Sequence, residues 1–212
     1  MSKKYELVKS DTKEFFGRTL YRVKYLRDGK YFSKGDLGGY IESESNLSQE
    51  DDACVSGNAW VSGNAWVYSN AWVFGDACVY GYACVSGNAW VSGNAGVSGN
   101  ARVYSNACVS GYACVSGNAW VSGYACVSGN ACVYSNACVS GDACVSGDVK
   151  IDFVLCSKFS FDNQAQVDKW LELEKEFEDI KDSLKDKPKE LEDLSKEELI
   201  QKIKELSEKK EE

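Results

Sequence analysis

The chain has 212 residues, a formal net charge of −8, ten cysteines, one proline and no histidine. This charge disfavours a general affinity for nucleic acid or anionic membranes. No apolar run reaches the length of a membrane span, and the polar start Met-Ser-Lys-Lys-Tyr-Glu lacks the apolar core of a signal peptide. We therefore expect a cytoplasmic protein.

Residues 1–46 are predicted to form a β-rich cap. The segment Thr19-Leu-Tyr-Arg-Val-Lys-Tyr-Leu alternates polar and apolar side chains, as a half-buried strand does, and Arg27-Asp-Gly-Lys is predicted as a hairpin turn. A solenoid needs such a cap, because the open edge of its first coil would otherwise pair with other chains.

Residues 47–157 are predicted to form a solenoid. From Ala53 to Asp148 an alanine recurs every sixth residue, sixteen times, and a valine follows each alanine two places later. In a strand these two positions face inward, while glycine, asparagine and aspartate turn the corners. The narrow interior favours three sides and eighteen residues per turn, which gives a parallel β-helix of about five to six coils.

The repeat Val-Ser-Gly-Asn-Ala-Trp resembles the hexapeptide-repeat, left-handed β-helix superfamily. The lead-in Lys34-Gly-Asp-Leu-Gly-Gly-Tyr to Asn46-Leu-Ser-Gln49 is similar to uncharacterised bacterial and phage proteins of that group, some named acetyltransferases or polymer-forming proteins. The left hand is implied by this resemblance alone, since parallel crossovers generally favour the right hand.

The absence of histidine restricts the chemistry that the resemblance implies. Hexapeptide acyltransferases use a histidine base, and the γ-type carbonic anhydrases of this fold hold zinc with three histidines. Neither chemistry can be carried over to this chain. The acidic residues within the repeat, Asp76, Asp142 and Asp148, stand at corner positions and are interpreted as turn residues.

Nine cysteines share one outward repeat position, and Cys156 is predicted to continue their phase. At eighteen residues per turn, Cys108, Cys126 and Cys144 stack in one column, Cys114 and Cys132 in a second, and Cys138 and Cys156 in a third. A strand spacing of about 4.8 Å would allow oxidative crosslinking. Zinc is disfavoured because a line of thiols does not converge on one point, so no metal or other cofactor is expected. The alternatives are a small outward filler and a redox or thiol role.

Outward aromatic residues form a predicted interaction surface, with Trp72, Phe74 and Trp90 on one face. A contiguous patch of tryptophans is unfavourable in water, so we expect it to be covered either by the chain's own terminal segments or by a partner. The predicted surface comprises Trp60, Trp66, Tyr68, Trp72, Phe74, Trp90 and Trp120.

Residues 158–212 are predicted to form acidic amphipathic helices. A first apolar stripe includes Trp170 and Phe177; Pro188 separates it from a second helix that begins near Ser195 and carries Leu199 and Ile203. These stripes are a predicted helical interface, because such helices cannot bury them alone.

Together these features predict a mainly β protein, a left-handed parallel β-helix with an N-terminal β cap and a C-terminal helical hairpin. We expect a non-catalytic binding or scaffold protein that recognises a protein partner or itself, as a homo-oligomer such as a trimer. The bacterial and phage resemblance suggests inhibition of a host system. The alternatives are an atypical transferase without the usual histidine base, a protein that sequesters a small ligand between subunits, and, less favoured, ice binding.

Overall fold

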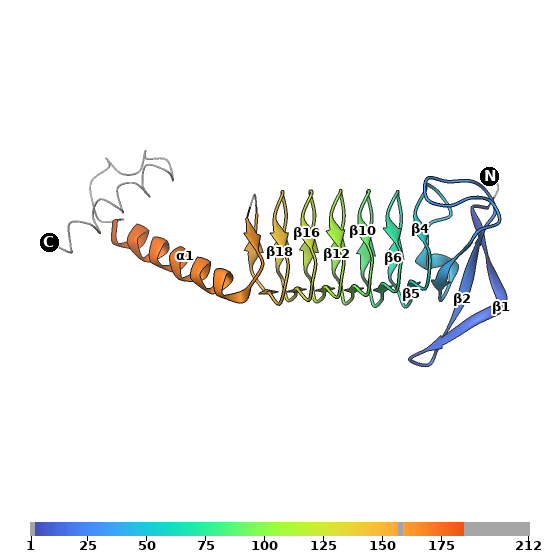
Figure 1. Ribbon diagram of the computed structural model, residues 1–212, viewed down its shortest axis with the longest axis horizontal. Coiled ribbons are helices and arrows are strands. Elements are labelled where there is room, and N and C mark those ends of the chain that lie inside the picture. The colour runs from blue at the N-terminus through green and yellow to red at the C-terminus, as the bar shows by residue number, and fades with distance from the viewer. Residues whose placement is uncertain (1–2, 157–158, 185–212) are drawn as a thin grey trace. The chain divides into compact units, whose positions relative to one another are not determined.

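In the computed structural model, described for residues 3–156 and 159–184, the chain is mainly β (Figure 1). Its central part is a parallel β-solenoid of about 7 turns with three sheets. An antiparallel cap precedes the solenoid, and one helix, α1 (Gln164–Leu184), follows it within the described residues. The predicted three-sided architecture is confirmed.

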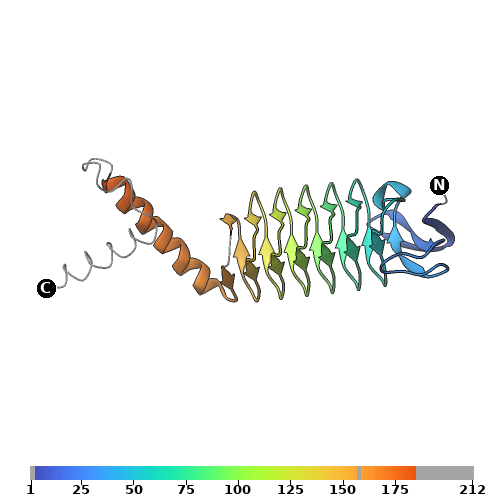
Figure 2. The same ribbon diagram turned by 90° about the horizontal axis from the view of Figure 1, so that it is seen from above.

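The strands within the described part of the chain fall into three sheets, and Figure 2 shows the strands of successive coils stacked along the solenoid. Sheet 1 has the order β1 (Tyr5–Phe15), β2 (Arg18–Tyr25), β3 (Leu37–Ile41), β5 (Trp60–Val61), β8 (Cys78–Val79), β11 (Gly96–Val97), β14 (Cys114–Val115), β17 (Cys132–Val133) and β20 (Lys150–Ile151). Sheet 2 has β4 (Cys54–Val55), β7 (Trp72–Val73), β10 (Trp90–Val91), β13 (Cys108–Val109), β16 (Cys126–Val127), β19 (Cys144–Val145) and β22 (Ser160–Phe161). Sheet 3 has β6 (Trp66–Val67), β9 (Cys84–Val85), β12 (Arg102–Val103), β15 (Trp120–Val121), β18 (Cys138–Val139) and β21 (Val154–Leu155).

The interior is a column of alanine and valine. Every repeat alanine and every repeat valine is buried, with at most 1% of its surface exposed. Strands eighteen residues apart pair in register, for example Val109 with Val127. The period therefore fixes both the inward phase and the three sides. The solenoid exceeds the five to six coils expected from the repeat, because β3 and the segment 149–161 also pair with it.

The corners depend on left-handed backbone. The first corner residue has positive φ throughout the repeat, and it is glycine except at Ser69, Ser105 and Ser135. The second corner residue is most often asparagine, and these side chains bond along the axis. Asn100 donates to Asn118 at 3.1 Å, and Asn118 donates to Asn136 at 3.0 Å. Asp76 and Asp148 accept from Asn58 and Asn130 in the same way, which fits their interpretation as turn residues.

Substitution at a corner provides the first prediction. Gly111 has φ +69°, and a Cβ there would lie 2.9 Å from the Gly129 carbonyl oxygen. We expect Gly111→Ala to lower the free energy of unfolding by about 1–2 kcal/mol, because left-handed backbone penalises any Cβ. Ser105→Ala is the matched control, since Ser105 already has a Cβ at φ 62°. Urea unfolding of both variants measures the difference, and equal losses would contradict the corner assignment.

The cap covers the exposed edge of the first coil, which has no preceding repeat coil to pair with. Along the repeats, the N–H groups of the residue after the alanine, the residue after the valine and the second corner residue donate to carbonyl groups of the next coil, as Cys54 does to Ala71, so the matching carbonyl groups of the first coil face the cap. Lys4 Nζ donates to the Ala53 carbonyl at 2.8 Å, and Asn46 Nδ2 donates to Ala65 at 2.8 Å. The Tyr25 hydroxyl both donates to the Val55 carbonyl and accepts from its N–H, each at 3.0 Å. Burial and nearby Arg27 lower the pKa of Lys4 to about 8.

The hairpin of the cap lies elsewhere than predicted. Strands β1 and β2 pair from Tyr5 with Tyr25 to Phe15 with Arg18, so their turn is Phe16-Gly17 and not Arg27-Asp-Gly-Lys. After β2 the chain instead makes an irregular loop with a bridge between Gly29 and Phe32. The predicted strand at residues 19–26 is confirmed as far as Tyr25, where β2 ends.

The last turn is shorter than the others. Cys138 pairs with Val154 rather than with Cys156, because the side between Ile151 and Leu155 has four residues instead of six. The predicted third cysteine column is therefore wrong; Cys156 is exposed and accepts a hydrogen bond from Ser140 at 3.3 Å. Gln164 Oε1 accepts from the N–H of Lys150 at the last edge of sheet 1.

Contacts group Met1–Val167, which holds the cap and the solenoid, into one compact unit, and the rest of α1 belongs to a second. Val167 is fully buried in the first unit. The predicted second helix, with Leu199 and Ile203, lies outside the described residues. Across the described segments, no helix is both long and apolar enough to cross a bilayer.

Candidate functional site

The candidate site is an aromatic groove between the tip of the β1–β2 hairpin and the first coils of sheet 1. We call it the hairpin groove. Its volume is about 510 Å³. Its lining residues are Phe15, Phe16, Arg18, Trp60, Ser62, Gly63, Asn64, Tyr80, Gly81 and Tyr82.

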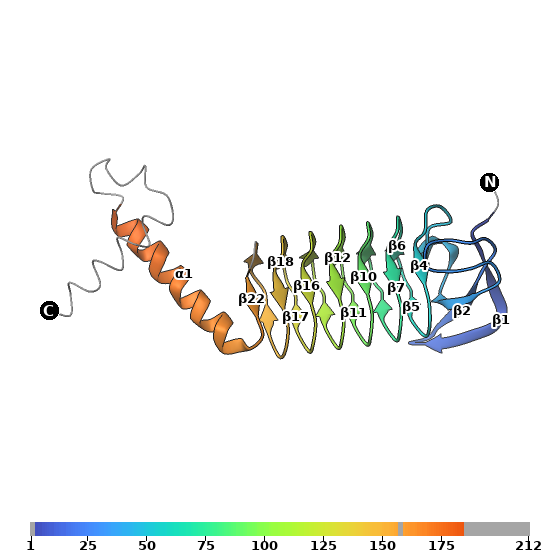
Figure 3. The same cartoon turned by 45° about the horizontal axis from the view of Figure 1, so that its top comes forward.

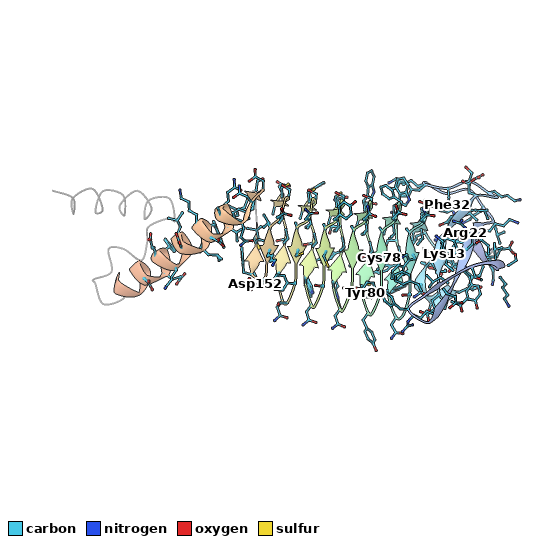
Figure 4. All side chains as sticks on the ribbon, turned by 60° about the horizontal axis from the view of Figure 1, so that its bottom comes forward. Lys13, Arg22, Phe32, Cys78, Tyr80 and Asp152 are labelled. Carbon is cyan, nitrogen blue, oxygen red and sulfur yellow. The ribbon has the colours of Figure 1, made fainter. Side chains whose placement is uncertain are left out.

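The aromatic floor comes from successive rungs of the solenoid. Trp60 is the outward residue of β5, and Tyr80 follows β8 on the next rung. Their rings stack at a centroid distance of 5.7 Å, and Phe15 packs on Trp60 at 4.2 Å. Figure 4 shows Tyr80 projecting outward from the solenoid. The eighteen-residue repeat therefore places aromatic residues of separate repeats side by side, and the hairpin adds the wall.

Among the large apolar residues that line the hairpin groove, Phe16 is the most exposed, with 90% of its surface accessible. It occupies the first position of a two-residue turn with φ 48°, followed by Gly17 with φ 72°. Such turns favour asparagine at this position, whereas a bulky residue at positive φ is strained. An exposed aromatic ring held in strained backbone indicates selection for something other than stability.

Glu42 fixes the position of the groove's polar rim. Its carboxylate accepts from Arg18 Nη1 at 2.7 and 2.8 Å and from the Gly63 N–H at 2.6 Å. Burial raises the pKa of Glu42, but the Gly63 N–H and the Arg18 guanidinium outweigh it and hold that pKa below its usual value. Arg18 and Gly63 both line the groove. The Arg18–Glu42 ion pair and the Gly63 N–H thus fasten the hairpin to a corner of the first coil.

A second aromatic cluster lies on sheet 2. Trp72 stacks on Phe74 at 4.1 Å and meets Trp90 edge to face at 5.8 Å, so these three residues share one face, as predicted. The cap covers part of it, because Tyr31 stacks on Trp72 at 4.7 Å. Trp90 remains 42% exposed beside a cavity of about 340 Å³ that also reaches Lys30 and Cys108.

The other predicted surface residues lie apart from both clusters. Trp66 stacks on Tyr68 at 4.2 Å on sheet 3, and Trp120 lies farther along the same sheet beside Arg102. Of the predicted surface, the structure brings only Trp60 into the hairpin groove. Sequence reasoning missed Phe15, Phe16 and Tyr82 as surface residues. An aromatic residue before a turn glycine was the available signal for Phe16, but no local pattern showed that the hairpin would fold back onto Trp60.

The cysteine columns follow the strand register. Cys108, Cys126 and Cys144 are adjacent rungs of sheet 2 and are half-buried. Cys54, at the same outward repeat position, is fully buried because the cap covers it, and its Sγ lies 3.3 Å from the Tyr25 hydroxyl oxygen. Burial raises the pKa of Cys54 to about 11. Within the residues that can be described, no group of three or more His, Cys, Asp or Glu could hold a metal ion.

Along α1, Trp170 and Phe177 are half-buried, while Leu171 and Leu173 are exposed. Trp170, Glu174 and Phe177 lie three to four residues apart and so share one face of the helix. That spacing agrees with the predicted stripe. Leu199 and Ile203, the other half of the predicted helical interface, stand outside the described residues.

No family model matches the chain, and a search of curated proteins gives no match either.

Proposed function

We propose that this chain is a non-catalytic scaffold protein that recognises protein surfaces through the hairpin groove, and that the groove's occupant is a second copy of the chain. The observation that carries the proposal is Phe16, an almost fully exposed aromatic ring in strained backbone beside an aromatic groove. Aromatic side chains are favoured interface anchors, and strain at a turn is retained where it serves binding.

Because the exposed Phe16 ring and the hairpin groove lie on the same face, they favour a symmetric dimer. In a two-fold interface the same surface serves both partners, so Phe16 of each copy can enter the groove of the other. Tyr82, 67% exposed at the groove's edge, would enlarge the contact. The Arg18–Glu42 pair holds the hairpin against the solenoid, so little ordering is needed on association.

The non-catalytic part of the proposal rests on residue chemistry. The chain has no histidine to act as a general base. Asp76 and Asp148 accept hydrogen bonds from corner asparagines and lie exposed in the asparagine ladders, as turn residues do. We also infer membership of the left-handed hexapeptide-repeat class, which the Ala-x-Val period supports.

The variant Phe16→Asn separates binding from stability. Asparagine suits the first position of this turn, so we expect the variant to be as stable as the parent or more stable by up to about 1 kcal/mol. Self-association should nevertheless weaken by roughly tenfold to a hundredfold, because an aromatic anchor is lost. Sedimentation velocity over a range of concentrations measures the association, and thermal unfolding measures the stability.

The matched control is Tyr124→Asn, which removes a second strongly exposed aromatic residue, 71% accessible, at a corner of the solenoid outside the hairpin groove. It should leave association unchanged. If Phe16→Asn associates as the parent does, or if the Tyr124 variant weakens association equally, the hairpin groove is not the interface.

A further inference from the structure

A column of three thiols on sheet 2 stands apart from the hairpin groove. Cys108 pairs in register with Cys126, and Cys126 pairs in register with Cys144 (Figure 3 labels β16, the strand of Cys126, among the stacked coils). Adjacent strands place such Cα atoms about 4.8 Å apart, within the range that a disulfide spans. All three thiols are half-buried, so none is sealed from solvent.

The three sulfur atoms interact along the column. The thiol of Cys126 hydrogen-bonds to Cys108, and this bond, together with the Ser110 hydroxyl, lowers the pKa of Cys108 although burial opposes it. The same bond and burial raise the pKa of Cys126. The hydrogen bond between Cys108 and Cys126 therefore stabilises a single thiolate within the pair, and the thiolate is the nucleophile in sulfur exchange.

A cavity opens onto the Cys108 end of the column. The 340 Å³ cavity beside Trp90 reaches Cys108, and Lys30 and Tyr31 of the cap line the same cavity. A small molecule can thus approach Cys108 next to an aromatic wall, with a cationic side chain at the rim. The other end of the column, Cys144, pairs with Ser160.

We propose that Cys108, Cys126 and Cys144 form a thiol–disulfide exchange site whose substrates are low-molecular-weight disulfides entering through the cavity at Cys108. The Cys108 thiolate attacks one sulfur of the small disulfide, forms a mixed disulfide and releases one small thiolate. Cys126 then loses its proton to solvent and attacks Cys108 Sγ, which releases the second small thiolate. The net reaction oxidises two protein thiols to one disulfide and reduces the small disulfide to two thiols.

The column geometry makes the product disulfide reactive. In-register strands also hold the Cβ atoms about 4.8 Å apart, whereas disulfides favour about 3.8 Å, so the Cys108–Cys126 bond is strained and easily reduced. Cys144 lies in line beyond Cys126. Its thiolate can attack Cys126 and expel Cys108, which moves the disulfide one rung without net oxidation. The Ser110 hydroxyl, which hydrogen-bonds to Cys108, stabilises the Cys108 thiolate that leaves in this step.

The chain contains its own controls. Cys84 is a single thiol on sheet 3 between Trp66 and Arg102, and Cys78 has Trp60 and Gly96 as its rung neighbours. Neither has an adjacent thiol on its rungs. Cys114 and Cys132 form a second adjacent pair, but burial raises the pKa of Cys114, so that pair should react more slowly.

The experiment treats the reduced full chain with a small molar excess of 5,5′-dithiobis(2-nitrobenzoate) and follows the released coloured thiolate, then maps the modified peptides by mass spectrometry. We expect a fast phase that releases two thiolates per chain and leaves a disulfide within the Cys108–Cys126–Cys144 column. Cys84 should react later and keep one bound aromatic thiol. The rate at Cys108 should persist to lower pH than the rate at Cys84, because the pKa of Cys84 is raised by burial.

Variants distinguish disulfide exchange at this column from thiol reactivity that depends on solvent exposure alone. Cys126→Ser should halve the thiolate released in the fast phase and trap the mixed disulfide on Cys108, and Cys126→Ala serves as a second version if the first folds poorly. Cys84→Ser should leave the fast phase unchanged. The proposal is overturned if Cys108 in the parent keeps the aromatic thiol, or if it reacts no faster than Cys84.

Discussion

Replacing Val109 with alanine is expected to lower the free energy of unfolding by about 2–3 kcal/mol. Val109 is fully buried and stacks in register between Val91 and Val127, so the lost methyl groups leave a cavity that rigid neighbouring coils cannot fill. Urea unfolding measures the loss.

The control is the triple variant in which Cys108, Cys126 and Cys144 become serine. These outward side chains are half-buried, and serine already stands two residues after each one. Surface exchanges usually change stability by less than about 0.5 kcal/mol each. A triple variant that loses as much stability as Val109→Ala would mean that the column, not the interior, carries the packing.

Replacing Tyr25 with phenylalanine is expected to cost about 2–4 kcal/mol. The hydroxyl satisfies both the N–H and the carbonyl of Val55 at the buried edge of β4, and each group left without a partner costs roughly 1–3 kcal/mol. Tyr124→Phe is the control, because its ring is mostly exposed at a corner, and it should change stability little. Thermal unfolding compares the two.

The same residue gives a pH dependence. Burial raises the pKa of Tyr25 well above 10, so the unfolded chain loses this proton first as the pH rises. Stability from Tyr25 is therefore complete below about pH 10 and decreases above it. Between pH 10 and 12 the parent should lose stability more steeply than Tyr25→Phe, and parallel pH profiles would contradict the capping role.

The fold was predictable because its determinants are local and repeated. The Ala-x-Val period sets the inward phase, and the glycine and asparagine corners set the sides, so Val109 and Gly111 could be placed from the sequence alone. The last turn was not predictable, since the repeat had faded before Ile151 and nothing in the local pattern specified a side of four residues.

The candidate site was less predictable because it depends on contacts between distant segments. The sequence identified Trp60 as outward, but the groove exists because Phe15 packs on it from forty-five residues away. Similarly, Tyr25 and Lys4 reach carbonyl groups on the first coil that no repeat position reveals. Long-range docking of an irregular cap onto a regular solenoid has no signature in hydrophobic periodicity.

Hydroxyl-radical footprinting of the full chain at low and high concentration tests the central claim, that copies of the chain recognise one another through the hairpin groove. The account predicts that Phe16 and Tyr82 lose reactivity as concentration rises, while the exposed corner residue Tyr124 does not. Unchanged reactivity at Phe16 while the mass in solution increases, or a mass that stays at 23.3 kDa throughout, would contradict it.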